Sequence, residues 1–280
     1  MILLKSAKEL AEFIQQARSN KRSIGFVPTM GALHKGHLSL IDRSRLQTGL
    51  TVCSIFVNPT QFNNPEDFKK YPVTIETDID MLEEHGCDLL FLPRVDEIYI
   101  PGTETIHYDL GYLETVLEAA YRPGHFQGVC QVVDRLLQIV DPDILYLGQK
   151  DLQQCMVIKK LTELKRFQTN LIICPTLREV DGLAMSSRNK RLNEVERNTA
   201  VLIYETLLKI KHALRTGSLQ ELKQNAINNL TGEGFKVDYV EIADADTLEL
   251  QTEWDGKKNI VALIAAYIND VRLIDNMLLN

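Results

Sequence analysis

The sequence predicts an α/β protein, with a Rossmann-like parallel sheet and flanking helices in residues 1–175 and a smaller α+β domain in residues 176–280. In the first part, short apolar segments alternate with segments of helical period, the order that gives parallel strands joined by crossover helices. Beyond Pro175, two successive helical segments precede three strand-like ones, as in an α+β domain. A chain of 280 residues is also long for a single core.

Helices and strands alternate through the predicted first domain. Ser6 and Glu9 have the spacing of a capping box, which predicts that a helix opens there. The run at 50–57 is almost entirely apolar, as expected of a central parallel strand covered on both faces. The expected helices are 6–17, 37–47, 74–85, 129–140 and 151–165, and the expected strands are 23–27, 50–57, 87–93, 105–110, 143–148 and 170–174.

The predicted second domain has a different order of elements. Ser218 and Glu221 predict a capping box at the start of its second helix. The alternating residues at 235–242 are typical of a strand. The expected elements are helices at about 193–215 and 218–230 and strands at 235–242, 259–268 and 271–279.

Composition and charge restrict the function. The net charge of −7 and the scattered Lys and Arg argue against nucleic acid as the main partner, because phosphate contacts need clustered basic residues. A local site for a small anion stays possible. The five cysteines include no Cys-x-x-Cys pair, so neither a disulfide framework nor a zinc knuckle is expected. No segment has the pattern of a secretion signal or the length of a membrane span, and we expect a cytoplasmic protein without a membrane partner.

The most informative segment is 25–41, in which His34-Lys35-Gly36-His37 lies where an apolar strand gives way to a helix. Free N–H groups and the positive end of the helix dipole make such a junction a site for anions. Gly31 and Gly36 let a bulky ligand approach the backbone. Zinc binding by the two histidines is disfavoured because no third ligand lies nearby in the sequence. Two isolated histidines would be interpreted as surface or hydrogen-bonded imidazoles, but the glycines and the junction weigh against this.

Four more polar segments follow predicted strand ends, where open parallel sheets bind ligands. They are residues 56–62, 122–128, 148–154 and 181–189. Together with segment 25–41, they resemble the pantothenate synthetase family, the pantoate–β-alanine ligases of the nucleotidylyltransferase superfamily. The resemblance spans essentially the whole chain, and the segments have the family's order and spacing. His34-Lys35-Gly36-His37 matches the His-x-Gly-His phosphate motif of the superfamily.

The resemblance implies an activity and its ligands. A member of this family would condense pantoate with β-alanine, using ATP and Mg²⁺, to give pantothenate, AMP and pyrophosphate through a pantoyl adenylate. It would be a homodimer whose partners are these small molecules. Attack of the pantoate carboxylate on ATP brings two anions together, so hydrogen-bond donors and cations are needed around the phosphates.

The resemblance also implies roles for individual residues. The catalytic residues would be His34, His37 and Lys150, with His37 as the proton donor. The residues that bind ATP would be Met30, Gly31, Ala32, Leu33, His34, Lys35, Gly36, His37, Gly148, Gln149, Lys150, Asp151, Leu177, Met185, Ser186, Ser187 and Arg188. Pantoate and β-alanine would contact Asn58, Gln61 and Gln154, since a glutamine amide binds a carboxylate without the repulsion of a Glu.

Some of these residues have plain structural interpretations when taken alone. Lys150 would be a solvated lysine, the serines helix caps, Gln61 loop filler and Gln154 an exposed helix residue. Met30 would be a core filler. The matched segments favour the functional roles.

The carboxylate beside Mg²⁺ is less well specified. Asp78 is taken as the metal ligand, with Asp151 as a second candidate, but Asp78 fits equally well on a solvated helix face. Gln149 stands where the family commonly has Glu, which is expected to change a local ion pair more than activity. Arg122 and His125 stay unassigned.

Other functions share part of the pattern. A simple nucleotidylyltransferase would have the His-x-Gly-His motif, but segments 56–62 and 149–154 and the C-terminal domain are not expected of it. An aminoacyl-tRNA synthetase would need a tRNA-binding module. A silent nucleotide-binding regulator would not be expected to keep both histidines, Lys150 and the Ser-Ser-Arg triplet.

Overall fold

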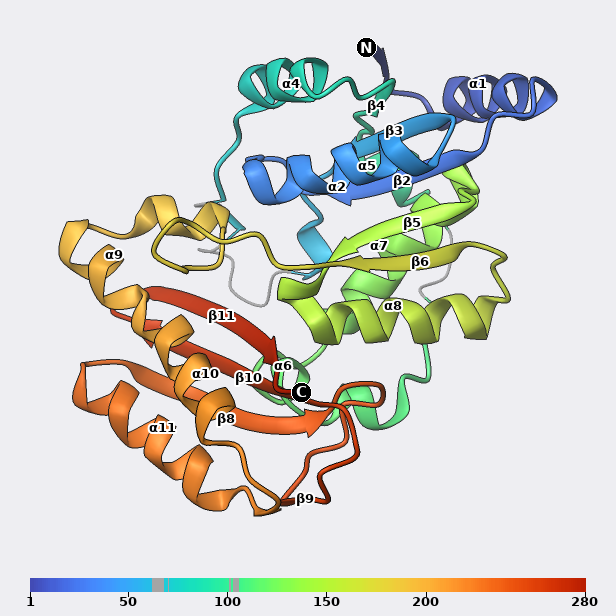
Figure 1. The fold of residues 1–280 in the computed structure, drawn as a ribbon. Coiled ribbons are helices and arrows are strands. Elements are labelled where there is room, and N and C mark those ends of the chain that lie inside the picture. The colour runs from blue at the N-terminus through green and yellow to red at the C-terminus, as the bar shows by residue number, and fades with distance from the viewer. Residues whose placement is uncertain (62–67, 70, 101, 103–105) are drawn as a thin grey trace. The chain divides into compact units, whose positions relative to one another are not determined.

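A computed structural model describes residues 1–61, 68–69, 71–100, 102 and 106–280 (Figure 1). The chain divides into two compact units. The first unit comprises residues 1–114, 122–148 and 154–175, and the second comprises 115–121, 149–153 and 176–280. Two short segments from the first 175 residues are thus part of the second unit. The sequence predicted a single boundary after residue 175 and did not predict these two segments.

In the described part of the first unit, six strands form a parallel sheet in the order β1-β4-β3-β2-β5-β6. The predicted α/β class is confirmed. The strands are β1 (Ile2–Leu4), β2 (Ile24–Thr29), β3 (Leu50–Ile55), β4 (Leu89–Phe91), β5 (Ile144–Gly148) and β6 (Asn170–Cys174). All six residues of β3 are buried, as expected of a central strand. The short edge strand β1, which pairs with β4, was not predicted.

Helices cover both faces of this sheet (Figure 1). They are α1 (Ala7–Ser19), α2 (Lys35–Gln47), α4 (Ile75–Glu84), α5 (Val95–Ile98), α7 (His125–Val140) and α8 (Leu152–Lys165), with 3-10 turns η1 (Pro59–Gln61) and η2 (Gly111–Glu114). The crossovers that contain α2 and α4 run in one direction along the sheet, and the crossover that contains α7 runs in the other. Because such crossovers are right-handed, α7 lies on the face opposite α2.

Local signals explain several helix ends. Ser6 caps α1 as expected, but its Oγ accepts from Lys8 N at 3.2 Å, one residue before the Glu9 position of a capping box. Helix α7 begins at His125 rather than at the predicted 129, directly after Gly124 in the left-handed region at φ 79°. The strand predicted at 105–110 is wrong for the described residues 106–110, and residue 105 lies outside them.

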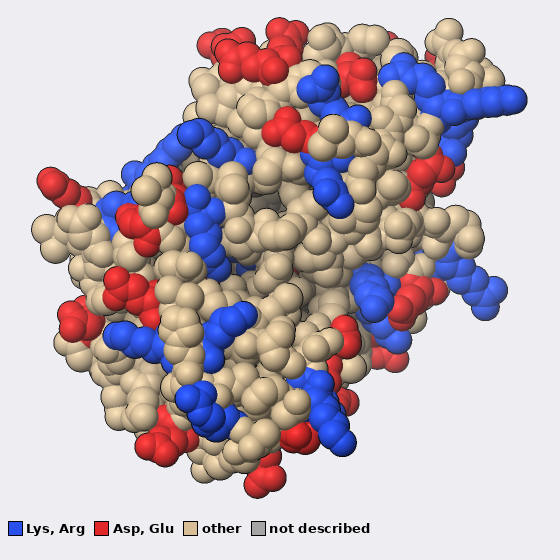
Figure 2. All heavy atoms as spheres, viewed as in Figure 1, with Lys and Arg blue, Asp and Glu red and all other residues tan. Residues whose placement is uncertain are grey.

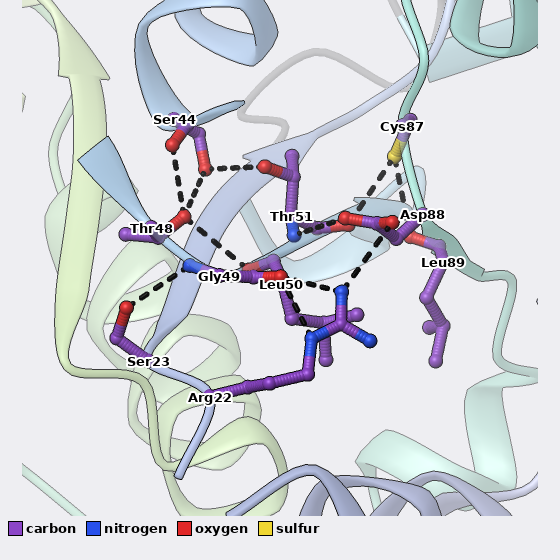
Figure 3. A network of polar contacts seen from close by, with 10 residues as sticks. All are labelled: Arg22, Ser23, Ser44, Thr48, Gly49, Leu50, Thr51, Cys87, Asp88 and Leu89. Carbon is purple, nitrogen blue, oxygen red and sulfur yellow. Dashed lines mark hydrogen bonds and ion pairs between the residues drawn. The ribbon is translucent and has the colours of Figure 1, made fainter. Parts of the chain in front are cut away.

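A polar network ties together the amino ends of β2, β3 and β4 (Figure 3). Arg22 Nε donates to Gly49 O at 2.8 Å, and Asp88 Oδ2 accepts from Thr51 N at 2.8 Å. The Arg22 guanidinium and the Asp88 carboxylate also pair at 3.6 Å. The hydroxyl groups of Ser44 and Thr51, 2.8 Å apart, link α2 to β3. These contacts fix the end of the sheet opposite the loops that carry the predicted site.

The second unit is an α+β structure, as predicted. Its elements are α6 (Glu118–Tyr121), η3 (Gln149–Asp151), η4 (Ser187–Arg191), α9 (Glu194–Ala200), α10 (Leu202–Ala213), β7 (Gly217–Ser218), α11 (Gln220–Gly232), β8 (Lys236–Asp244), β9 (Glu253–Trp254), β10 (Ile260–Ile268) and β11 (Val271–Leu278). The antiparallel sheet has the order β11-β10-β8, and α10 and α11 pack on it around an apolar core. Strands β7 and β9 form a separate pair.

Helix boundaries in the second unit differ from the expectation. The single helix expected at 193–215 is divided at Val201 into α9 and α10. The capping box predicted at Ser218 and Glu221 is wrong, because α11 has Leu219 as its N-cap, without a side-chain cap bond. A capping box is instead formed at the start of α9, by Asn193 and Glu196.

Charges of both signs are interspersed on the molecular face that Figure 2 shows. On the face shown in Figure 2, Lys and Arg alternate with Asp and Glu rather than gathering in one basic patch. No helix in the described part of the chain is long and apolar enough to cross a membrane.

Candidate active site

The strand order places the predicted segments that follow β2 and end β5 at one region of the first unit. Beyond β2 the chain adds β3 and β4 on one side, whereas β5 and β6 lie on the other. The direction in which the chain adds strands to the sheet thus reverses between β2 and β5. In open parallel sheets, ligands bind beyond the carboxyl ends of the strands at such a point. The His34 segment follows β2, and Gly148 ends β5.

The two predicted histidines lie together at the start of α2. His34 is the N-cap residue, and its Nδ1 accepts from Gly36 N at 3.1 Å. The ring centroids of His34 and His37 are 4.0 Å apart. Because Nδ1 of His34 accepts a hydrogen bond, the proton of the neutral ring is assigned to Nε2. The pair therefore presents imidazole groups at a helix N-terminus, where anions are stabilised.

Asp78 fixes the backbone that leads to His34. Its Oδ2 accepts from Ala32 N at 2.9 Å, and its Oδ1 accepts from Leu33 N at 2.8 Å and from Thr74 Oγ1 at 3.1 Å. The carboxylate is 1% exposed, so its assignment to a solvated helix face is wrong. Ala32 has a positive φ of 50°, which is uncommon for a residue with a side chain, and the two bonds to Asp78 hold this conformation.

A second group of predicted residues lies in the loop after β3. Asn58 is 1% exposed, and its Nδ2 donates to Gln61 Oε1 at 3.2 Å and to Gly128 O at 3.1 Å. Gln61 Nε2 contacts Met30 Sδ at 2.7 Å, which connects this loop to the segment after β2. Asn58 therefore orients Gln61.

Residues that the sequence left unassigned support the same loop. His125 Nδ1 lies 2.8 Å from Gln61 O, and the Tyr99 hydroxyl donates to Asn58 Oδ1 at 2.6 Å. Burial raises the pKa of Tyr99, so this hydroxyl keeps its proton. A Cβ on Gly128 would lie 2.5 Å from Thr60 O, so glycine is required for α7 to approach the loop this closely.

The two neighbouring glutamines at the start of α8 have different environments. Gln154 is half-buried, in contrast to the exposed helix position considered from the sequence. Gln153 is 3% exposed, and its amide accepts from Glu118 N at 2.8 Å and donates to Val116 O at 2.9 Å. Gln153 therefore serves the structure of the second unit, and Gln154 is the one with partial access to solvent.

In the second unit, residues 149–151 form the turn η3. Lys150 is 18% exposed, and its Nζ lies 3.7 Å from Asp151 Oδ2. The Asn276 side chain donates to Gln149 O at 2.8 Å and to Lys150 O at 3.0 Å. Gln149 Nε2 donates in turn to Asn276 Oδ1 at 3.1 Å. Gln149 and Asn276 thus form a neutral amide pair.

The segment that contains the Ser-Ser-Arg triplet begins with a tight turn. Leu177 O accepts from Met185 N at 3.0 Å, and residues 178 and 184 form an isolated antiparallel bridge. Ser186 is the N-cap of η4, with its Oγ accepting from Arg188 N at 3.2 Å. Ser186 therefore acts as a helix cap in this structure, the role that it would have as an isolated serine. Ser187 is 9% exposed.

Comparison with known proteins gives the family. A model of the family described as pantoate-beta-alanine ligase matches residues 2–278. The chain belongs to this family. It is accordingly a ligase that joins pantoate and β-alanine to form pantothenate, as the sequence predicted.

Relatives of this ligase match over the full length. The pantothenate synthetase of Cytophaga hutchinsonii is 44% identical over 284 residues, which cover 100% of this chain and 99% of the relative. The crystal structure of pantothenate synthetase from Thermus thermophilus is 38% identical, covers 99% of both chains and has a TM-score of 0.91. The ligase from Francisella tularensis, complexed with β-γ ATP and β-alanine, is 39% identical with a TM-score of 0.83 and covers 99% of this chain and 97% of that one.

The described residues of this pantoate–β-alanine ligase do not form a metal site by themselves. Among the described residues, no group of three or more His, Cys, Asp and Glu side chains is arranged to hold a metal ion. The Asp78 oxygens accept backbone and hydroxyl hydrogen bonds, and Asp151 pairs with Lys150. A protein-only Mg²⁺ cage therefore does not fit these residues.

Two residues of this ligase that the sequence did not single out connect parts of the candidate site. Asp275 and Asn276 are 4% and 2% exposed, and both lie on β11. Asn276 contacts η3, and Asp275 accepts from both Nη atoms of Arg178, at 2.5 and 3.0 Å. Burial raises the pKa of Asp275, while the positive charges of Arg178 and Lys150 act in the opposite direction. The available signal was a consecutive Asp-Asn pair in a strand whose other residues, apart from Arg272, are apolar.

Proposed function

We propose that this ligase activates pantoate with ATP, forming pantoyl adenylate and pyrophosphate, and then transfers the pantoyl group to β-alanine with release of AMP. The observation that carries the proposal is the pair of imidazoles at the N-terminus of α2, with ring centroids 4.0 Å apart at the switch point of a parallel sheet. A nucleotide phosphate is the ligand that this geometry favours.

In the first step, the pantoate carboxylate attacks the α-phosphorus of ATP and pyrophosphate leaves. Negative charge spreads over the phosphate oxygens, so fixed donors lower the barrier. In our proposal His34 donates through Nε2, and His37 donates a proton or hydrogen bond to the phosphate. Residues 30–33 approach the nucleotide with their backbone, which Asp78 holds in place.

The residues proposed to bind ATP also include some of the second unit. Lys150 supplies a cation, and Ser186, Ser187 and Arg188 supply hydroxyl and guanidinium groups for the phosphates. The other proposed contacts come from the chain around these groups. They are Lys35, Gly36, Gly148, Gln149, Asp151, Leu177 and Met185.

Pantoate would be held by the glutamine amides. Asn58 occupies Gln61 Oε1 and so fixes the direction of the Gln61 side chain, whose NH₂ group is the suitable donor to a carboxylate. Gln154, half-buried at the start of α8, is the second proposed contact. Neutral amides bind the pantoate anion without opposing its negative charge.

In the second step, the β-alanine amine attacks the acyl carbon and AMP departs. The bond between the acyl carbon and the adenylate oxygen breaks, and an amide forms with loss of one proton from the amine. No covalent enzyme intermediate is needed, so none of the five buried thiols takes part.

Mg²⁺ is proposed to enter with ATP. Mg²⁺ usually keeps several waters and binds substrate phosphates with one or two carboxylates. Since no cage fits among the described residues, the phosphates and water would provide most of its ligands. Asp151, which is half-exposed at 49%, is an accessible carboxylate in the matched segment 148–154. In this proposal Asp78 holds the loop instead.

The proposal also covers the compartment and the oligomeric state of the enzyme. The five cysteines are free and buried, which agrees with a reducing compartment such as the cytoplasm. A homodimer is proposed from family membership, and light scattering on the purified protein would measure the mass directly.

The deciding experiment is isotope exchange between pyrophosphate and ATP by the purified protein. Exchange that requires pantoate but not β-alanine is the expected result, because the adenylate forms before the amine enters. Exchange without pantoate would contradict the proposed order and favour a simple nucleotidylyltransferase. Absence of exchange, with nucleotide binding intact, would favour a silent nucleotide-binding regulator.

A further inference from the structure

The last strand of the second unit carries a consecutive pair of buried polar residues with two different partners. Asp275 and Asn276 are paired through their backbones with Ile264 and Leu263 of β10, so the strand ladder does not need their side chains. Consecutive strand residues point to opposite faces of a sheet. Burying two polar side chains is costly unless they are fully hydrogen-bonded, and here each is bonded to a segment of the proposed ATP site.

Asn276 uses its whole amide on the turn that carries Lys150. Its Nδ2 donates to two successive carbonyl oxygens, Gln149 O at 2.8 Å and Lys150 O at 3.0 Å. Its Oδ1 accepts from Gln149 Nε2 at 3.1 Å. These three bonds fix the backbone from which the Lys150 side chain projects. A lysine has a long, flexible side chain, so its ammonium group is placed accurately only if that backbone is fixed.

Asp275 holds the neighbouring proposed segment in the same unit. Its carboxylate binds the Arg178 guanidinium, which also donates to Gly182 O at 3.1 Å and Asn276 O at 3.3 Å and lies 4.5 Å from the centroid of the Tyr204 ring. Arg178 begins the turn that returns to Met185. One dipeptide of β11 thus supports both segments of the second unit that we assign to ATP.

We propose that Asn276 is a positioning residue for Lys150. The inference rests on the proposed function, specifically on Lys150 acting on the ATP phosphates. Displacement of a catalytic group by about 1 Å can cost on the order of 100-fold in rate. The amide is the required group, because an aspartate of the same shape lacks both donors that hold the carbonyl oxygens of 149 and 150.

The experiment compares Asn276→Ala and Asn276→Asp with wild type in pantoate-dependent exchange of pyrophosphate into ATP. Both variants are expected to lower kcat by roughly 10- to 100-fold, with the KM for pantoate unchanged. Asn280→Ala is the matched control: its side chain also bonds backbone groups, accepting from Ile260 N and donating to Lys258 O, which lie outside the turn η3 that Asn276 holds. This control should keep wild-type kinetics.

A double variant separates positioning from general stability. If Asn276 acts through Lys150, then Asn276→Ala should lower kcat little further in a Lys150→Ala background, because interacting residues are non-additive. Independent, multiplying losses would overturn the inference, as would a lower melting temperature without a change in kcat. Hydrogen exchange of the amides at 149–153 should increase in Asn276→Ala and not in Asn280→Ala.

The same variants distinguish the proposed role of Lys150 from the positioning role of Asn276. Wild-type exchange by Lys150→Ala would contradict the proposed role of Lys150 itself. Loss of activity in Lys150→Ala with wild-type kcat in folded Asn276→Asp would overturn only the positioning role. If the Asn276 variants do not fold, Gln149→Met removes one of the three bonds from the other side, and a several-fold fall in kcat is expected; an unchanged kcat would count against the inference.

Discussion

Arg272 of β11 and Glu118 of α6 form a two-point ion pair, with Nη1 donating to Oε2 at 2.7 Å and Nη2 to Oε1 at 2.8 Å. Arg272 Nε also donates to Asp238 Oδ2 at 2.8 Å, and the Tyr239 hydroxyl donates to Glu118 Oε1 at 2.9 Å. Asp238 is skipped in the register between β8 and β10, which marks a β-bulge in β8. Burial opposes the charge of Arg272, but the two carboxylates outweigh it and raise the pKa of the guanidinium.

Arg272→Leu is predicted to destabilise the second unit strongly. It leaves Glu118 and Asp238, 8% and 10% exposed, without their cation. Removing one partner of a buried ion pair costs about 3–5 kcal/mol, which urea unfolding followed by circular dichroism would measure. The control is Lys8→Ala, which breaks an exposed pair with Glu12 and should change stability by less than about 0.5 kcal/mol. Equal effects of the two substitutions would contradict the prediction.

Asp78→Asn is predicted to disturb the loop before His34. One accepting oxygen becomes an NH₂ group facing a backbone N–H, so a loss of about 1–3 kcal/mol in stability and a higher KM for ATP are expected. The Mg²⁺ concentration for half-maximal activity should stay at the wild-type value. A several-fold rise in that concentration would instead identify Asp78 as a metal ligand. Asp80→Asn, at an exposed position of the same helix, is the control.

Gly128→Ala is predicted to displace the loop that carries Gln61. The added Cβ would lie 2.5 Å from Thr60 O and 3.0 Å from the Gln61 Cα, so the backbone must move. Overpacking of this kind costs about 1–3 kcal/mol, and the KM for pantoate should rise. Gly232→Ala is the matched control, since its Cβ would meet nothing within 4 Å. A wild-type KM in Gly128→Ala would show that the loop does not position pantoate.

His37→Ala is predicted to lose about 3 kcal/mol of transition-state stabilisation, the order found when a preorganised donor is removed. This corresponds to a fall of roughly 100-fold in kcat/KM, measured in the pyrophosphate exchange assay. His85→Ala is the control, because His85 pairs with Asp42 on the surface of the same unit. An unchanged rate in His37→Ala would assign the two adjacent histidines a purely structural role.

The buried thiols are predicted to weaken the fold at alkaline pH. Burial raises the pKa of Cys87 and Cys130 to about 12, whereas an unfolded cysteine titrates near 8.5. Between these values the unfolded chain loses protons that the folded chain keeps. Stability is therefore complete below about pH 8 and falls above it, by up to about 1.4 kcal/mol per pH unit for each such thiol.

Unfolding by urea at several pH values from 8 to 11 would measure this decline. Cys130→Ala removes one of these thiols, so the free energy of unfolding of the variant should fall less steeply with pH than that of wild type. This difference in slope is expected whatever effect the substitution has on stability at pH 8. A thiol reagent should label the native protein slowly at pH 8 and all five cysteines after unfolding. Rapid labelling of Cys87 or Cys130 in the native protein would contradict the assigned pKa values.

Most of the fold could be predicted because the central strands are continuous apolar runs between helical segments. The run at 50–57 became β3, whose residues are all buried. Strand β1 was missed because three apolar residues before a helix have no distinct period, and its pairing with β4 depends on a distant segment. The break at Val201 interrupts a continuous helical pattern without a Gly or Pro to mark it.

In the candidate site, too, the residues placed by nearby sequence could be predicted, whereas those placed by distant partners could not. His34 and His37 could be predicted together because one helix start determines both positions. The roles of Gln153 and Gln154 could not be separated, because the partners that bury Gln153 lie 35 and 37 residues earlier in the chain. Asn276 was missed for the same reason.

The separation between Asn276 and Lys150, 126 residues along the chain, also has a consequence for protein synthesis. At about 5–20 residues per second, a ribosome needs roughly 6–25 s to travel from one to the other. A nascent chain that ends before β11 already contains every polar segment that matches the family, yet lacks the amide that holds the Lys150 backbone. If Asn276 has the proposed positioning role, full catalytic competence arrives with the last strand, and unfinished chains consume ATP more slowly than finished ones.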